Sequence, residues 1–79
     1  MNNNVSSHKI RFKLAMSAEK YMAYYKGKAG YIMAQSLDNR KVTFPASAIR
    51  SFLTHEGIFG LFEIHFDEKN KLIEIKKIN

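Results

Sequence analysis

Apolar and polar side chains alternate in short stretches along the chain. Between His8 and Leu14, the apolar residues Ile10, Phe12 and Leu14 alternate with three basic residues. Strict alternation of this kind predicts a half-buried strand. Further strands are predicted for residues 31–35, 41–44, 62–66 and 73–76, giving about five in all.

A single helix is predicted between the first two strands. Ser17 is a suitable N-cap, because its hydroxyl can accept a hydrogen bond from a free backbone N–H. Glu19 suits the positive end of the helix dipole. Gly27 is expected to end the helix in the left-handed conformation. The apolar stripe expected to face the core is Ala18, Tyr21, Met22 and Tyr25.

The second and third strands are predicted to form a hairpin. Asp38-Asn39 is interpreted as a two-residue loop, which places Phe44 opposite Met33. The second strand, which includes Ile32, is apolar on both faces. It is therefore either central in a curled sheet or part of a contact between subunits.

The last two strands give the strongest local prediction. A loop centred on Lys69-Asn70 puts two apolar pairs on one face and two polar pairs on the other, and a slip by one residue would invert both faces. The polar pairs carry opposite charges or a histidine beside a carboxylate. The expected pairs are Phe66 with Ile73, Ile64 with Ile75, His65 with Glu74 and Glu63 with Lys76.

These elements predict an α+β fold. Pro45 suits the first turn of a short helix from Ala46 to Leu53, so the order is strand, helix, two strands, short helix, two strands. No parallel strand–helix–strand repeat occurs, so we expect a mainly antiparallel sheet with one helix packed on it, open or curled towards a barrel. Residues 1–7 are predicted to be a flexible tail, and residues 8–79 a single domain.

Length and composition limit where such a domain can function. A chain of 79 residues buries only about 60% of its unfolded surface, and it contains no cysteine for disulfide bonds or thiolate metal sites. No apolar run approaches the roughly 20 residues of a membrane span, and the first residues lack the pattern of a signal peptide. We therefore expect a cytoplasmic protein that does not insert into membranes.

Positive charge suggests one class of partner. The formal net charge is +6, and Lys9, Arg11 and Lys13 share one strand face at spacings of roughly 7 Å. With Lys76 they are candidate contacts to the phosphates of a nucleic acid. The competing interpretation is an ordinary solvated strand face.

Residues capable of catalysis or metal binding are sparse. His55 and Glu56 are the only acid–base candidates, in a predicted turn. Glu63, His65 and Asp67 share a strand face but are expected to pair across the hairpin rather than hold a metal. We predict no catalytic residues, no metal site and no cofactor, and thus a protein that is not an enzyme.

Several short motifs resemble a known family of small bacterial proteins, domain of unknown function 2835. The motifs are Tyr24-Tyr25-x-Gly27, Phe44-Pro45-Ala46, Ile49-Arg50, Phe52, Thr54-His55-Glu56-Gly57-Ile58, Gly60-x-Phe62 and Phe66-Asp67-Glu68-x-Asn70-Lys71. The resemblance implies a short, single-domain, cytoplasmic bacterial protein with no established activity.

Departures from the family pattern suggest a second class of partner. Ser51 stands where the resemblance implies a proline, and Phe59 and Leu61 stand where it implies basic residues. Both apolar residues alternate outward from Phe62, so together with Ile32 they are candidate contacts to a protein partner or a second copy. We therefore expect a binding or interaction module, with nucleic acid as the alternative partner.

Overall fold

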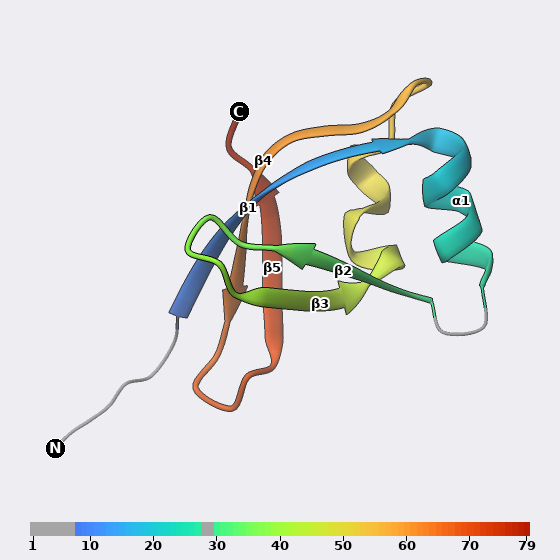
Figure 1. Cartoon of the computed structure of the whole chain (residues 1–79). Helices are drawn as coiled ribbons and strands as arrows, with labels where there is room; N and C mark the ends of the chain where they lie inside the picture. Colours follow the sequence, from blue (N-terminus) through green and yellow to red (C-terminus); the bar gives the residue numbers. More distant parts are fainter. Residues whose placement is uncertain (1–7, 28–29) are drawn as a thin grey trace, which may run out of the picture.

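The computed structural model describes residues 8–27 and 30–79, so the predicted tail at residues 1–7 lies outside the described residues. Figure 1 shows the arrangement. The elements are β1 (His8–Ser17), α1 (Ala18–Lys26), β2 (Tyr31–Gln35), β3 (Lys41–Pro45), the 3-10 helix η1 (Ala46–Phe52), β4 (Gly57–Phe66) and β5 (Leu72–Lys77). Within the described ranges, no helix is both long and apolar enough to cross a membrane.

The five strands form two antiparallel sheets. One sheet has the order β1–β4–β5, and the other consists of β2 and β3. An isolated bridge from Phe12 to Ser36 joins them, and the Leu37 N–H donates to the Arg11 carbonyl at 2.8 Å. The predicted α+β class is confirmed, and the strands do not close into a barrel.

The core lies between the two sheets and beneath the helices. The Phe12 ring on β1 lies 5.3 Å from Phe44 on β3 and 5.7 Å from Phe62 on β4, measured between centroids. The buried Tyr21 hydroxyl of α1 donates to the Ala46 carbonyl at 2.7 Å, which ties α1 to the start of η1. Burial raises the pKa of Tyr21, so its phenol stays protonated and continues to donate this bond.

The helix α1 begins as the sequence predicts and ends differently. The Ser17 hydroxyl accepts a hydrogen bond from the Lys20 N–H at 3.1 Å, so the predicted N-cap is confirmed. The predicted left-handed conformation of Gly27 is wrong, because its φ is −70° and its backbone is extended. Its N–H instead donates to the Tyr24 carbonyl, which closes the last turn without a left-handed residue.

The β2–β3 hairpin has a different register from the predicted one. Phe44 lies opposite Ile32 rather than Met33, because the loop has three residues, 37–39, instead of two. Asn39 ends this loop at a φ of 70°, the left-handed position typical of a three-residue hairpin loop. Ile32 therefore points into the core, while Met33 points outward and is 63% exposed.

The β4–β5 hairpin confirms three of the four predicted pairs: Ile64 with Ile75, His65 with Glu74 and Glu63 with Lys76. The predicted pairing of Phe66 with Ile73 is wrong. Phe66 lies opposite Leu72, and the irregularity beside it is a β-bulge that leaves Ile73 without a partner on β4. Ile73 is consequently 50% exposed.

Candidate binding surface

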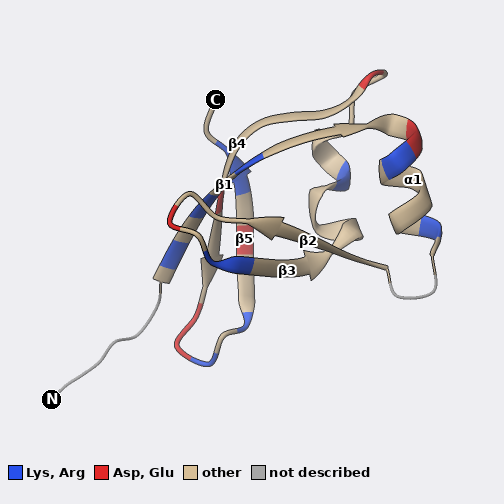
Figure 2. Ribbon diagram, viewed as in Figure 1, with Lys and Arg blue, Asp and Glu red and all other residues tan. Residues whose placement is uncertain are grey.

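Long-range pairing of β1 with β4 gathers most of the predicted contact residues on one surface, which we call the outer face. Lys9, Arg11 and Lys13 on β1 lie opposite His65, Glu63 and Leu61 on β4, and β5 adds Glu74 and Lys76. All four predicted polyanion contacts therefore share the outer face. Figure 2 shows the basic segments along β1 and both signs of charge along β5.

At one end of the outer face the charges are paired with one another. The Arg11 Nε donates to Glu63 Oε2 at 3.1 Å, and Glu63 is only 9% exposed despite being ionised. The hydrogen bond from Arg11, with the nearby charges of Lys9 and Lys76, holds the pKa of Glu63 below its usual range. The ammonium of Lys76 lies 4.0 Å from Glu74. Two of the four predicted cations thus face a carboxylate of the same molecule.

His65 occupies the centre of this charged end. It lies between Lys9 on β1 and Glu74 on β5, and its Nε2 is buried without a hydrogen-bond partner among the described residues. Within residues 8–27 and 30–79, no three His, Asp or Glu side chains are placed to hold a metal ion.

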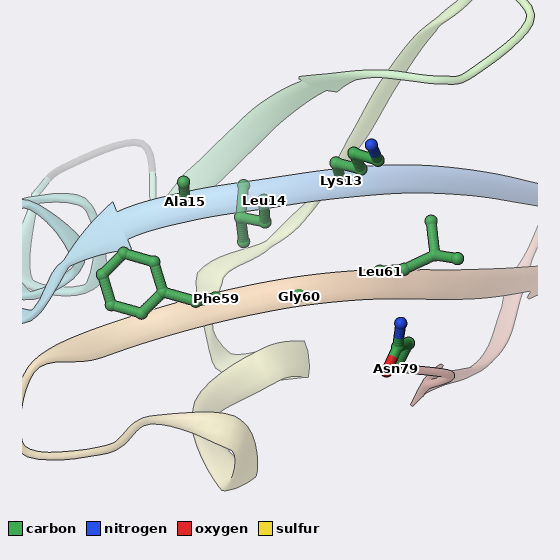
Figure 3. A pocket seen from close by; sticks show the side chains of 7 residues that line it. All are labelled: Lys13, Leu14, Ala15, Phe59, Gly60, Leu61 and Asn79. Carbon is green, nitrogen blue, oxygen red and sulfur yellow. The ribbon is translucent and has the colours of Figure 1, made fainter.

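At the other end of the outer face, a groove of about 440 Å³ opens over β1 and β4. Figure 3 shows its lining, with the Phe59 ring beneath Ala15 and with Lys13 and Leu61 near its other end. The lining residues are Lys13, Leu14, Ala15, Phe59, Gly60, Leu61 and Asn79. Phe59 is 47% exposed, although it is a large apolar side chain. The groove therefore has mainly apolar walls and one cationic side chain.

Gly60 allows the chain to close around this groove. Its φ is +145°, and a Cβ at this position would lie 2.7 Å from the Asn79 carbonyl oxygen and 2.8 Å from Lys77 Cε. The space is needed because the end of the chain lies against β4: the Leu61 N–H donates to the Asn79 carbonyl, and the Ile78 N–H donates to the Leu61 carbonyl. Lys77 Cε therefore lies close to Gly60, although Lys77 does not line the groove, and no Asp or Glu side chain lines it.

The structure separates the three predicted protein contacts. Phe59 and Leu61 both line the groove, as outward-facing neighbours on β4. Ile32 does not join them, because it is 1% exposed and packs in the core. The apolar side chains that β2 does expose are Tyr31 and Met33. The sequence alone does not indicate that Ala15, Gly60 and Asn79 line a groove with Phe59, because their proximity depends on how β4 pairs with its neighbouring strands.

His55 and Glu56, the only acid–base candidates, are exposed in the turn between η1 and β4. The turn is held by Thr54, whose hydroxyl donates to the Gly57 carbonyl at 2.7 Å. Neither His55 nor Glu56 lines the groove.

Comparison with known proteins identifies the family. Residues 8–78, nearly the whole chain, match the family described as Protein of unknown function (DUF2835). The chain belongs to this family. No curated protein and no solved structure matches it.

The motifs that resemble DUF2835 lie mainly at the junction of α1, η1 and β4. A Cβ on Gly57 would lie 2.0 Å from the Met16 carbonyl oxygen, so only glycine fits where β4 begins. The Arg50 guanidinium stacks over the Tyr25 ring at 5.1 Å and donates to its hydroxyl at 2.8 Å. These residues maintain the fold, and the groove lies on the neighbouring face.

Proposed function

We propose that this protein is a binding module rather than an enzyme, and that its groove accepts an apolar side chain from an acidic segment of a partner protein. The observation that carries the proposal is the groove itself, where Phe59 remains half exposed beside Lys13. Burial of an exposed aromatic ring by a partner is favourable, and aromatic residues are frequent contact centres in interfaces.

The size of the groove suits a small contact. Its volume of about 440 Å³ can enclose one or two large side chains but not a folded surface. A contact of this kind buries less than about 1,200 Å² in total, the range of weak and transient complexes. We therefore expect affinity on the order of micromolar or weaker, with specificity from the apolar anchor.

Charge favours an acidic partner at this groove over a second copy. The chain carries +6, and Lys13 lines the groove with no Asp or Glu side chain in the lining. Two copies meeting here would bring their Lys13 side chains together, whereas a partner with Asp or Glu beside its apolar residue would be attracted. Such complementarity also speeds association at low salt.

The test uses a short synthetic peptide with one Phe between Asp and Glu residues, titrated into the full-length protein. Backbone amide NMR shifts should change mainly in residues 13–15 and 59–61. Phe59→Ser should weaken binding about tenfold or more, because it removes an anchor in the groove. Met33→Ser is the matched control, since Met33 is exposed on the other sheet.

The peptide series also separates the two parts of the proposal. A peptide with Ser in place of Phe tests the apolar anchor, and one with Lys in place of the acids tests the charge. Lys13→Gln should weaken only the acidic peptide, and Lys20→Gln on α1 should change nothing. Shifts outside the groove, or equal binding by the Phe59→Ser variant, would contradict the proposal.

A second candidate function is binding to the phosphates of single-stranded nucleic acid, supported by the common face of Lys9, Arg11, Lys13 and Lys76. It is weaker, because Glu63 and Glu74 lie between these cations. An oligothymidine binding assay across salt concentrations tests it. Lys9→Gln should reduce the slope of log affinity against log salt by about 0.7. Absence of binding at low salt would exclude this candidate.

A further inference from the structure

The outer strand β5 has one edge that no described strand pairs with. We propose that β5 of one molecule pairs with β5 of a second copy, antiparallel and with a two-fold axis at Ile75. This extends the three-stranded sheet across two molecules. The inference is independent of the groove and of its proposed partner.

The backbone of β5 presents the right groups to a second copy. The Ile78 N–H donates to the Leu61 carbonyl of β4. Peptide groups alternate in direction along a strand, so those of Ile75 and Lys77 point away from β4, towards the free edge. Ile75 at the two-fold axis would exchange both of its backbone hydrogen bonds with Ile75 of the second copy.

Side-chain charge selects this register. With the axis at Ile75, Glu74 lies opposite Lys76 of the second copy, and the same pair repeats by symmetry. Side chains of the two copies stay on the same faces of the extended sheet only if the second strand shifts by two residues at a time. One such step in either direction places Glu74 opposite Glu74, or Lys76 opposite Lys76, which is repulsive. Among neighbouring registers, only the proposed one avoids both.

Exposed apolar residues at the ends of the strand add to the contact. Ile73 is 50% exposed because of the β-bulge, and Ile78 is also exposed. In the proposed register Ile73 lies opposite Lys77 of the second copy, whose methylene groups can cover it. The competing interpretation is that the charged residues and the bulge of β5 protect this edge from pairing, and it predicts a strict monomer.

Analytical ultracentrifugation of the full chain tests the inference. The apparent mass of the wild-type protein should rise with concentration from 9.1 kDa towards twice that value. Glu74→Lys places lysines opposite each other, and Lys76→Glu places glutamates opposite each other. Each substitution alone should weaken association about tenfold or more.

Mixing the two variants gives the decisive result. The first has lysine at both positions and the second has glutamate at both, so a one-to-one mixture should associate more tightly than either alone. Glu56→Lys and Lys20→Glu change the net charge equally at exposed sites away from β5 and should leave wild-type association unchanged. Circular dichroism of each variant confirms that it is folded.

Three outcomes would overturn the inference. One is a wild-type protein that stays at 9.1 kDa at millimolar concentration. Another is association that neither β5 substitution weakens, which would place the contact elsewhere. The third is a mixture of the two folded variants that associates no better than its components.

Discussion

The two hairpins of this protein share one kind of turn and differ in what their strands tolerate. Each loop has three residues and ends in a left-handed asparagine, Asn39 with φ 70° and Asn70 with φ 63°. A backbone hydrogen bond closes each loop: Ser36 to Arg40 at 2.7 Å, and Asp67 to Lys71 at 2.9 Å. Equal turns therefore begin two pairs of strands.

The strands that follow these turns differ. The β2–β3 pair is regular, and its loop is fixed to β1 by the bond from Leu37 to Arg11. The β4–β5 pair accommodates an extra residue, Ile73, within the β-bulge. A turn therefore sets where strand pairing starts, while the burial of each strand decides whether an irregularity in that pairing is tolerated.

Matched deletions in the two hairpins should have the largest and most unequal effects on stability. Met33 and Ile73 are both large, apolar and exposed strand residues. Deleting Met33 forces Ile32 or Ala34 out of the core, and we expect a loss of about 3 kcal/mol or more. Deleting Ile73 removes the bulge and leaves Leu72 opposite Phe66, so the expected loss is below about 1 kcal/mol.

Urea unfolding followed by tyrosine fluorescence measures both deletions, since the chain has no tryptophan. A chain of this length has a total stability on the order of 4 to 12 kcal/mol, so a loss of about 3 kcal/mol on deletion of Met33 is a large share of the total. Equal losses for the two deletions would contradict the different tolerance of the hairpins.

Alanine substitutions at the two left-handed positions should destabilise the protein by similar amounts if the turns are equivalent. Asn39→Ala and Asn70→Ala should each cost about 1 kcal/mol, because a residue other than glycine or asparagine is strained at positive φ. Asn39→Gly and Asn70→Gly should cost less than the alanine variants. Thermal unfolding of the four variants checks this. A cost at only one site would show that the turns are not equivalent.

Acid should destabilise both turns by protonating one aspartate in each, and different partners stabilise the two carboxylates. The guanidinium of Arg40 and the Ser36 hydroxyl lower the pKa of Asp38, whereas backbone N–H groups of Lys71 and Lys69 lower that of Asp67. Each stabilisation is present above the unfolded value of about 3.9 and is lost as pH falls through the lower folded pKa.

Salt should then distinguish the two carboxyls, because it screens the exposed ion pair more than the backbone hydrogen bonds. Carboxyl ¹³C NMR titrations at low and high salt should show the pKa of Asp38 rising towards its ordinary value by more than that of Asp67. A larger rise for Asp67 would contradict the assignment of these causes.

The two hairpins differ in how much of their strand register could be predicted from the sequence. In β4 and β5 the apolar and charged faces agree on one register, so three pairs were predictable from residues alone. The bulge was not, because Ile73 is as apolar as the core residues beside it. In β2, Ile32 and Met33 are adjacent and both apolar, so alternation could not choose between them. The asparagine at position 39 was the available signal for a three-residue loop.

The candidate binding surface was predictable only in part. Alternation placed Phe59, Leu61 and Lys13 on outward faces, and the structure agrees. Their meeting in one groove depends on β1 pairing with β4, and no local pattern indicates which strands will be neighbours. Burial of Glu63 was likewise hidden, since its partner Arg11 is 52 residues away in the chain.

That separation has a consequence for how the molecule is made. A ribosome releases β1 first, yet the central strand that completes its pairing emerges only after some fifty further residues. Until then β1 lacks its neighbouring strand, and their pairing depends on late closure of a long loop, an entropically slow event. The β4–β5 hairpin needs no such wait, because its two strands are neighbours in the chain.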